Sequence, residues 1–259
     1  MSGGRRVQAA GGTRPPGLPH GVHAASEAAR LGRTLVVVPH PDDETIGCGG
    51  LLALLAAARV AVQVVLVSDG AASHPDSHEF TAPRMRALRA GEMVTALCEL
   101  GLGAQHLKMM GLPDGDVPSA GGPAFDLAVV RLVRKMVEFR PACVLLPCNT
   151  DQHPDHRATH AIGTAACDLA AFGARRLAYT VWPPDGDRGV ANITPTARQW
   201  SIDVRPVLDK KRRALAAHRS QLGQVVHDDP HGFQLPAMLI DRCNAAHETY
   251  IDITPHSAP

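Results

Sequence analysis

The segment Thr34-Leu35-Val36-Val37-Val38-Pro39-His40-Pro41-Asp42-Asp43-Glu44 joins an apolar, β-branched run to a row of potential ligand side chains. The apolar part predicts a buried strand. Ligands of open parallel sheets bind outside the carboxyl ends of the strands. The polar residues that follow this strand are therefore candidates for a functional site.

Similar apolar runs alternate with helical patterns on both sides of this segment. Strands are expected at 60–68, 105–110, 142–146 and 177–182, in addition to 34–38. Helices are expected at 50–58, 83–100, 124–139 and 155–172. Such alternation predicts an α/β fold with a Rossmann-like, mostly parallel sheet flanked by helices.

The chain is long enough for one α/β domain of ordinary size. Residues 1–30 are rich in Gly, Pro, Ala and Arg and are expected to form a flexible N-terminal tail, with a short helix at 24–31 as an alternative. Residues 31–259 are expected to form a single domain. Its C-terminal part, 183–259, is expected to cap the site, with strands near 200–204 and 248–253 and a helix at 206–221.

Composition excludes several classes of partner. The net charge is +1, with 26 basic and 25 acidic residues, and aromatic residues make up only 3%, so nucleic acid is not expected to bind. No apolar run reaches the roughly 18–20 residues of a membrane-spanning helix. The first residues lack the apolar core of a secretory signal, and six cysteines form no C-x-x-C pair. These features predict a cytoplasmic protein with buried thiols.

A second polar motif, His153-Pro154-Asp155-His156, follows the apolar run at 142–146 after a short polar loop. The two motifs converge if their strands are neighbours. A catalytic zinc site needs three protein ligands and one open position, and it favours imidazole and carboxylate groups. We expect His40, Asp43 and His156 to bind Zn²⁺, and Fe²⁺ is an alternative for the same ligand set.

Hydrolysis at such a site requires further groups. Bound zinc lowers the pKa of its water to about 7, so an adjacent carboxylate can remove a proton from that water at neutral pH. Asp42, beside Asp43, is the candidate for this general base. His153 is the candidate proton donor or oxyanion stabiliser. Asp155 is expected to fix the His153 tautomer and raise its pKa, and Glu44 to orient a ligand.

The two motifs resemble those of the LmbE-like, or PIG-L, N-acetylglucosaminyl deacetylases. Further matching segments are Ser68-Asp69-Gly70, Arg89-Ala90-Gly91-Glu92, Gly111-Leu112-Pro113-Asp114-Gly115 and Ala217-His218-Arg219-Ser220-Gln221. The resemblance implies a zinc-dependent deacetylase acting on a small N-acetylated amino-sugar substrate: a glycolipid, a sugar-inositol thiol precursor or an antibiotic intermediate. It also implies substrate contacts from Arg89 and Asp114, and His218 is a further candidate for such a contact.

Two other functions remain open from sequence. The same chemistry would serve a zinc amidase that cleaves a thiol conjugate or another non-sugar amide. The Asp42-Asp43 pair also occurs in magnesium-binding receiver modules, although imidazoles favour zinc over magnesium. Gly47-Cys48-Gly49-Gly50 lacks the full dinucleotide-binding pattern and is expected to form a tight strand-to-helix turn. The His227 to His231 loop and the oligomeric state have no interpretation.

Overall fold

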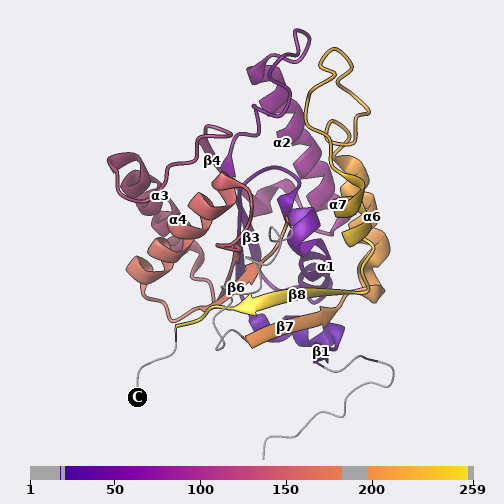
Figure 1. Cartoon of the computed structure of the whole chain (residues 1–259). Helices are drawn as coiled ribbons and strands as arrows, with labels where there is room; N and C mark the ends of the chain where they lie inside the picture. The colour runs from indigo at the N-terminus through magenta and orange to yellow at the C-terminus, as the bar shows by residue number, and fades with distance from the viewer. Residues whose placement is uncertain (1–17, 19–20, 183–197, 256–259) are drawn as a thin grey trace, which may run out of the picture.

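The computed structural model describes residues 18, 21–182 and 198–255. An eight-stranded sheet lies between two layers of helices (Figure 1). The strand order is β1-β7-β8-β6-β5-β2-β3-β4. The predicted α/β class with a mostly parallel sheet is confirmed, since only β8 pairs antiparallel with its neighbours β6 and β7.

The strands follow the apolar runs of the sequence. Their bounds are β1 Val22–His23, β2 Thr34–Val38, β3 Val62–Ser68, β4 Leu107–Leu112, β5 Cys143–Pro147, β6 Arg175–Tyr179, β7 Arg198–Asp203 and β8 His247–Asp252. Every residue of β2 and β5 is buried. Burial on both faces explains why these strands read as continuous apolar runs rather than alternating ones.

Helices cover both faces of the sheet. The α-helices are α1 Asp43–Ala57, α2 Ala82–Glu99, α3 Pro123–Phe139, α4 Pro154–Ala170, α6 Leu208–Ala217 and α7 Ala237–Arg242, with short 3₁₀ helices η1 Ala25–Leu31, η2 Ala104–His106 and η3 Arg205–Val207. One apolar core lies under α1, α2, α6 and α7, and a second lies under α3 and α4. None of the described helices is long and apolar enough to cross a bilayer.

Two sequence expectations change in the structure. Of the residues expected to form a tail, 21–30 belong to the fold, because Val22 and His23 pair with β7 and Ala28 is buried in η1. Within its described residues, the segment expected to cap the site supplies β7 and β8 to the sheet, and Phe233, Leu235 and the α7 residue Leu239 line the cavity described below. The part of that segment at 183–197 lies outside the described residues. The six cysteines are free thiols, five of them buried as expected and Cys98 exposed.

Helix α1 begins at Asp43, about two turns before the predicted start, and is broken at Cys48 (φ −150°, ψ 19°). The glycines expected to form a turn therefore lie inside the helix, at its break. A Cβ on Gly47 would lie 2.3 Å from the Tyr179 ring, and a Cβ on Gly50 would lie 2.9 Å from Glu248 Oε1. Only glycine permits these approaches.

A buried ion pair satisfies the backbone groups freed by this break. Glu248 accepts hydrogen bonds from the backbone N–H groups of Gly50 and Leu51, both at 2.8 Å. Lys211 Nζ donates to Glu248 Oε1 at 2.6 Å and to the Ile46 carbonyl at 3.1 Å. A carboxylate at the restarted N-terminus and an ammonium at the interrupted carbonyl match the polarity of the helix ends. The pair thus stabilises the broken helix.

Glu248→Gln should lower the free energy of unfolding by about 3–5 kcal/mol, because Lys211 would remain buried without a counter-charge. Urea denaturation monitored by circular dichroism measures this. Glu99→Gln is the matched control, since it breaks the exposed Glu99–Arg213 pair and should cost less than about 1 kcal/mol. Equal losses in the two variants would show that the buried pair does not stabilise the helix.

Candidate metal centre and active site

The two sequence motifs meet because their strands are neighbours. β2 pairs in parallel with β5, with Val36 opposite Leu145. The loops after both strands therefore emerge at the same edge of the sheet. His40 lies in the loop after β2, His156 lies in the first turn of α4 just beyond the loop after β5, and their ring centroids are 5.2 Å apart.

The three predicted ligands present a compact set of donor atoms. His40 Nδ1, Asp43 Oδ2 and His156 Nε2 lie 3.2 Å from one another along all three edges. Tetrahedral zinc with bonds of about 2.0–2.1 Å separates its ligand atoms by roughly 3.3 Å. The spacing of these three donor atoms therefore fits a divalent ion.

The carboxylates and imidazoles of this cluster stabilise one another's charged forms. Burial favours the neutral acid of Asp43, yet His156 and His40 hold its pKa well below the usual range. Burial also opposes the charged form of His156, but Asp43 and Asp151 raise its pKa to about 9.

His153 is a second candidate for the third ligand, since donor atoms of His40, His153 and His156 lie within 4.8 Å of one another. The tighter triangle favours Asp43 as the third ligand.

Two carboxylates contact the ring nitrogens of His40 and His156 that are not part of the donor triangle. His40 Nε2 lies 3.0 Å from Asp155 Oδ2, and His156 Nδ1 lies 3.1 Å from Asp151 Oδ2. Such partners fix the tautomer and increase the basicity of a metal-binding histidine. Asp151 was missed by the sequence analysis, although its place two residues before His153 in a polar loop after a strand was a usable signal.

Asp42 occupies a strained position beside the ligands. Its backbone has φ 127° and ψ −29°, a region that non-glycine residues rarely adopt. The Asp42 N–H donates to Glu44 Oε2 at 3.0 Å, which helps to hold this conformation. Burial raises the pKa of Asp42 to about 7, against the lowering effect of Arg89. A carboxylate with such a pKa suits a general base at neutral pH.

Glu44 and His218 form a buried support for Asp42. His218 Nε2 lies 3.0 Å from Glu44 Oε1, and both residues are 0% exposed. His218 does not line the cavity, so its position does not support the substrate contact expected from sequence. Glu44 likewise holds Asp42 and His218 rather than a metal ligand. Sequence could not distinguish a buried histidine from one that faces the substrate.

His153 differs from expectation in its protonation. Its Nδ1 accepts a hydrogen bond from the Asp155 backbone N–H at 3.2 Å, where it caps α4. Burial, with His40 and His156 nearby, lowers the pKa of His153. Asp155 acts against this lowering through its charge, as expected, but its carboxylate lies 3.0 Å from His40 Nε2, and burial and the two other imidazoles outweigh it. The neutral ring that results carries its proton on Nε2 and can donate it in a hydrogen bond.

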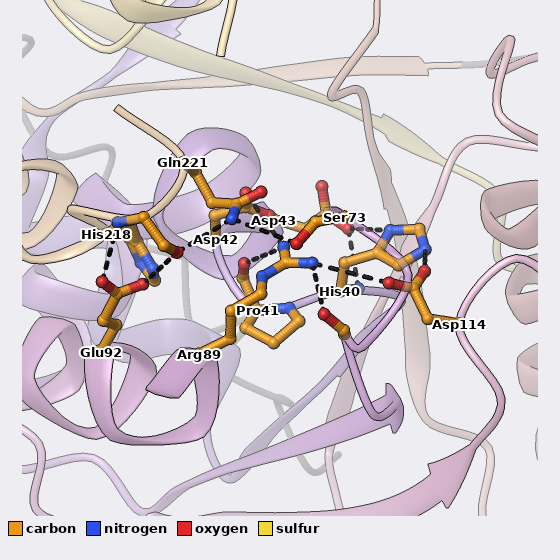
Figure 2. Close-up of polar contacts among 12 residues, drawn as sticks. His40, Pro41, Asp42, Asp43, Ser73, Arg89, Glu92, Asp114, His218 and Gln221 are labelled. Atoms are coloured by element: carbon orange, nitrogen blue, oxygen red, sulfur yellow. Dashed lines mark hydrogen bonds and ion pairs between the residues drawn. The ribbon is translucent and has the colours of Figure 1, made fainter. Parts of the chain in front are cut away.

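Arg89 and Asp114 form an ion pair next to His40 (Figure 2). Arg89 donates to the carbonyls of Gly70 and Pro41, and its Nη2 lies 3.4 Å from Asp42 Oδ2. Asp114 Oδ1 lies 3.2 Å from His40 Nε2, and its Oδ2 lies 3.6 Å from Arg89 Nη1. Both side chains line the cavity, which is compatible with the predicted substrate contacts.

A cavity of about 290 Å³ opens over this cluster. Its lining includes His40, Asp42, Asp43, Arg89, Asp114, His153 and His156. These are seven of the nine predicted site residues; Asp155 lies behind His40 and His218 behind Glu44.

The loop from His227 to His231 fastens one wall of this cavity. Asp228 accepts hydrogen bonds from the Ser77 hydroxyl at 2.7 Å and from the backbone N–H groups of His78 and Glu79 at 2.8 Å. The Phe233 N–H donates to the Ser73 carbonyl at 2.7 Å. Ser73 and Phe233 both line the cavity. The loop that sequence left without interpretation therefore joins two segments of the wall.

Comparison with known proteins agrees with this geometry. Residues 35–167 match the family model described as PIG-L, GlcNAc-PI de-N-acetylase. A 1D-myo-inositol 2-acetamido-2-deoxy-alpha-D-glucopyranoside deacetylase of Rhodococcus erythropolis is 31% identical over 238 residues, covering 73% of this chain and 81% of the relative. A 2'-N-acetylparomamine deacetylase of Streptomyces fradiae is 28% identical, covering 75% of each chain. The chain belongs to the PIG-L family, whose deacetylases are metal-dependent.

Solved structures share the fold at lower identity. An A40926 pseudoaglycone deacetylase has a TM-score of 0.62 at 20% identity, covering 87% of this chain and 99% of that one. The 4-carboxy-2-hydroxymuconate hydratase of Pseudomonas putida has a TM-score of 0.61 at 18% identity, covering 88% and 98%. A deacetylase and a hydratase thus share this architecture, so the fold alone does not define the reaction.

Asp151→Ala should weaken divalent-ion binding by about 10–100-fold, because His156 would lose the partner that orients its ring. Competition of the purified protein with a chromogenic zinc chelator measures the affinity. Asp168→Ala is the control, since Asp168 lies on the exposed side of α4 and pairs with Arg176. Wild-type affinity in Asp151→Ala would contradict the orienting role.

Asp42→Gly should raise the free energy of unfolding of the metal-free protein by about 1 kcal/mol while activity is lost. Relief of about 1–3 kcal/mol of backbone strain exceeds the entropic cost of a glycine, about 0.5–1 kcal/mol. Denaturant titration of wild type and variant checks this. A variant less stable than Asp42→Asn would indicate that the positive φ carries no strain.

Proposed function

We propose that the chain is a zinc-dependent hydrolase that removes an N-acyl group from an amino sugar. The observation that carries the proposal is the 3.2 Å triangle of His40, Asp43 and His156 donor atoms beside a buried Asp42. The relatives are named as deacetylases of amino-sugar substrates, which supports an N-acetylglucosaminyl or related glycoside as substrate.

His40 Nδ1, Asp43 Oδ2 and His156 Nε2 would hold the metal ion. When bound, zinc supplies a Lewis acid that lowers the pKa of water and polarises a carbonyl. Zinc is preferred to magnesium because two of the three donors are imidazoles. Fe²⁺ suits the same donors and is the alternative metal.

Asp42 would take a proton from the attacking water. Its buried carboxylate has a pKa raised to about 7, and a bound cation would lower that value and keep the group in its basic form. Arg89, 3.4 Å away, stabilises the carboxylate in one orientation. Asp42 can later return the proton to the leaving amine.

His153 would stabilise the oxygen on which negative charge develops. As a neutral imidazole with its Nδ1 occupied by the Asp155 N–H, it offers Nε2–H as a fixed hydrogen-bond donor. A donor of this kind contributes about 10²–10³-fold to turnover. Arg89 and Asp114 would bind the hydroxyl groups of the sugar.

Variants of the proposed ligands and of the base should separate metal binding from turnover. His40→Ala and His156→Ala should lose both zinc and activity, whereas Asp42→Asn should retain zinc and lose about 10²–10⁴-fold in kcat. Elemental analysis gives the metal content, and mass detection of deacetylated product from a panel of N-acetylated glycosides gives the activity. Full zinc content in His156→Ala would reject the ligand assignment.

The panel also distinguishes the second candidate reaction. Thiol conjugates and simple non-sugar amides, assayed beside the glycosides, should react more slowly because they lack hydroxyl groups for Arg89 and Asp114. Faster cleavage of thiol conjugates would show that the enzyme is an amidase for non-sugar substrates, which uses the same catalytic groups, and not a sugar deacetylase.

A further inference from the structure

The cavity over the proposed metal centre has two chemically different halves. Its polar half contains Ser73, Arg89, Asp114 and Gly115. Its apolar half contains Ile46, Val181, Trp182, Phe233, Leu235 and Leu239. An acetyl group presents a single methyl, for which an apolar surface of this extent is larger than required.

The strand order places part of the apolar half, Val181 and Trp182, away from Ser73 and Asp114, while Phe233 adjoins both sides through its N–H bond to the Ser73 carbonyl and its ring contact with Trp182. Ser73 and Asp114 follow β3 and β4, which lie on one side of β2. Val181 and Trp182 follow β6, which lies on the other side of β2, beyond β5. Because the proposed ligands follow β2 and β5, they lie between Asp114 on one side and Trp182 on the other.

The apolar half of the cavity directly adjoins the proposed metal ligands. The Trp182 N–H donates to Asp151 Oδ2 at 3.2 Å, and the same carboxylate oxygen lies 3.1 Å from His156 Nδ1. The rings of Trp182 and Phe233 meet edge to face at 6.2 Å, and Ile46 lies on α1 three residues after Asp43. The apolar surface thus begins next to the proposed ligands.

An amide substrate has two arms, and the two halves match them. The amine arm is a hydroxyl-bearing sugar, which suits the polar groups near Asp114 and Arg89. The acyl arm then extends from the scissile carbonyl toward Trp182 and Phe233. Burial of its methylene groups against these side chains is favourable.

We propose that the natural substrate carries an acyl chain longer than acetyl, from butyryl to octanoyl, on the amino sugar. Water adds to the carbonyl carbon, the C–N bond breaks, and the products are the free amine and the corresponding fatty acid. This inference rests on the proposed function and adds the identity of the group that is removed.

The test is a series of glucosamines acylated with acetyl, butyryl, hexanoyl and octanoyl groups, assayed with the zinc-loaded enzyme. The free energy of burying one methylene corresponds to about a fourfold effect, so kcat/KM should rise about two- to fourfold per methylene from acetyl to hexanoyl. A steady fall with chain length, with acetyl as the best substrate, would overturn the inference and leave the deacetylase function intact. No cleavage of any member would overturn the proposed function itself.

Variants in and outside the cavity lining test whether the apolar side chains cause the preference for longer acyl chains. Phe233→Ala should lower kcat/KM for the hexanoyl substrate at least tenfold more than for the acetyl substrate. The matched control is Met238→Ala, an exposed α7 residue outside the cavity lining, which should leave the ratio of the two unchanged. Equal losses for both substrates in Phe233→Ala would contradict an acyl-binding role for this wall.

A final arm tests the opposite orientation of the substrate. Octyl N-acetylglucosaminide carries its apolar chain on the sugar instead of on the acyl group. If this glycoside is cleaved faster than N-acetylglucosamine while longer acyl groups bring no gain, the apolar half binds the aglycone and the inference is overturned. A gain only from acyl length supports it.

Discussion

The parallel pairing of β2 with β5 is the constraint on which the site depends. Residues more than one hundred positions apart reach one triangle of donor atoms only because these strands are adjacent and end at the same edge of the sheet. Asp114 follows β4 and Trp182 follows β6, so these two groups lie on opposite sides of the pair. Strand order therefore fixes part of the chemistry around the proposed ligands, and the segment with Phe233, Leu235 and Leu239 supplies another part of the cavity lining.

Much of this arrangement was readable from sequence. Strands β2 and β5 are buried on both faces, so their apolar runs identified them. The polar motifs that follow the two runs pointed to the residues that the structure brings together as a possible metal site. Helix boundaries were less predictable. Glycine lowers helix propensity, and the Gly47–Gly50 stretch looked like a turn; the helix persists there because Glu248 and Lys211 satisfy the freed backbone groups. Neither side chain is near in sequence, so local reasoning could not include them.

The roles of individual polar residues were the least accessible part. His218 and His153 look equivalent in a sequence, yet one is buried against Glu44 and the other lines the cavity. Asp155 contacts His40, and Asp151 contacts His156. Which carboxylate meets which histidine depends on the directions of the side chains at the start of α4. The His227 to His231 loop offered no motif, because what Asp228 does there is accept hydrogen bonds from the Ser77 hydroxyl and from the backbone N–H groups of His78 and Glu79. Such contacts follow from the folded structure and leave little pattern in composition.

The dependence of α1 on Glu248 bears on how the protein is made. Domains begin to fold during synthesis, from the N-terminus, at about 5–20 residues per second. The helix that carries Asp42 and Asp43 is among the first to leave the ribosome, but the carboxylate that caps its second half belongs to β8, the last strand of the sheet. In a nascent chain the break in this helix therefore stays without its Glu248 cap until β8 has emerged.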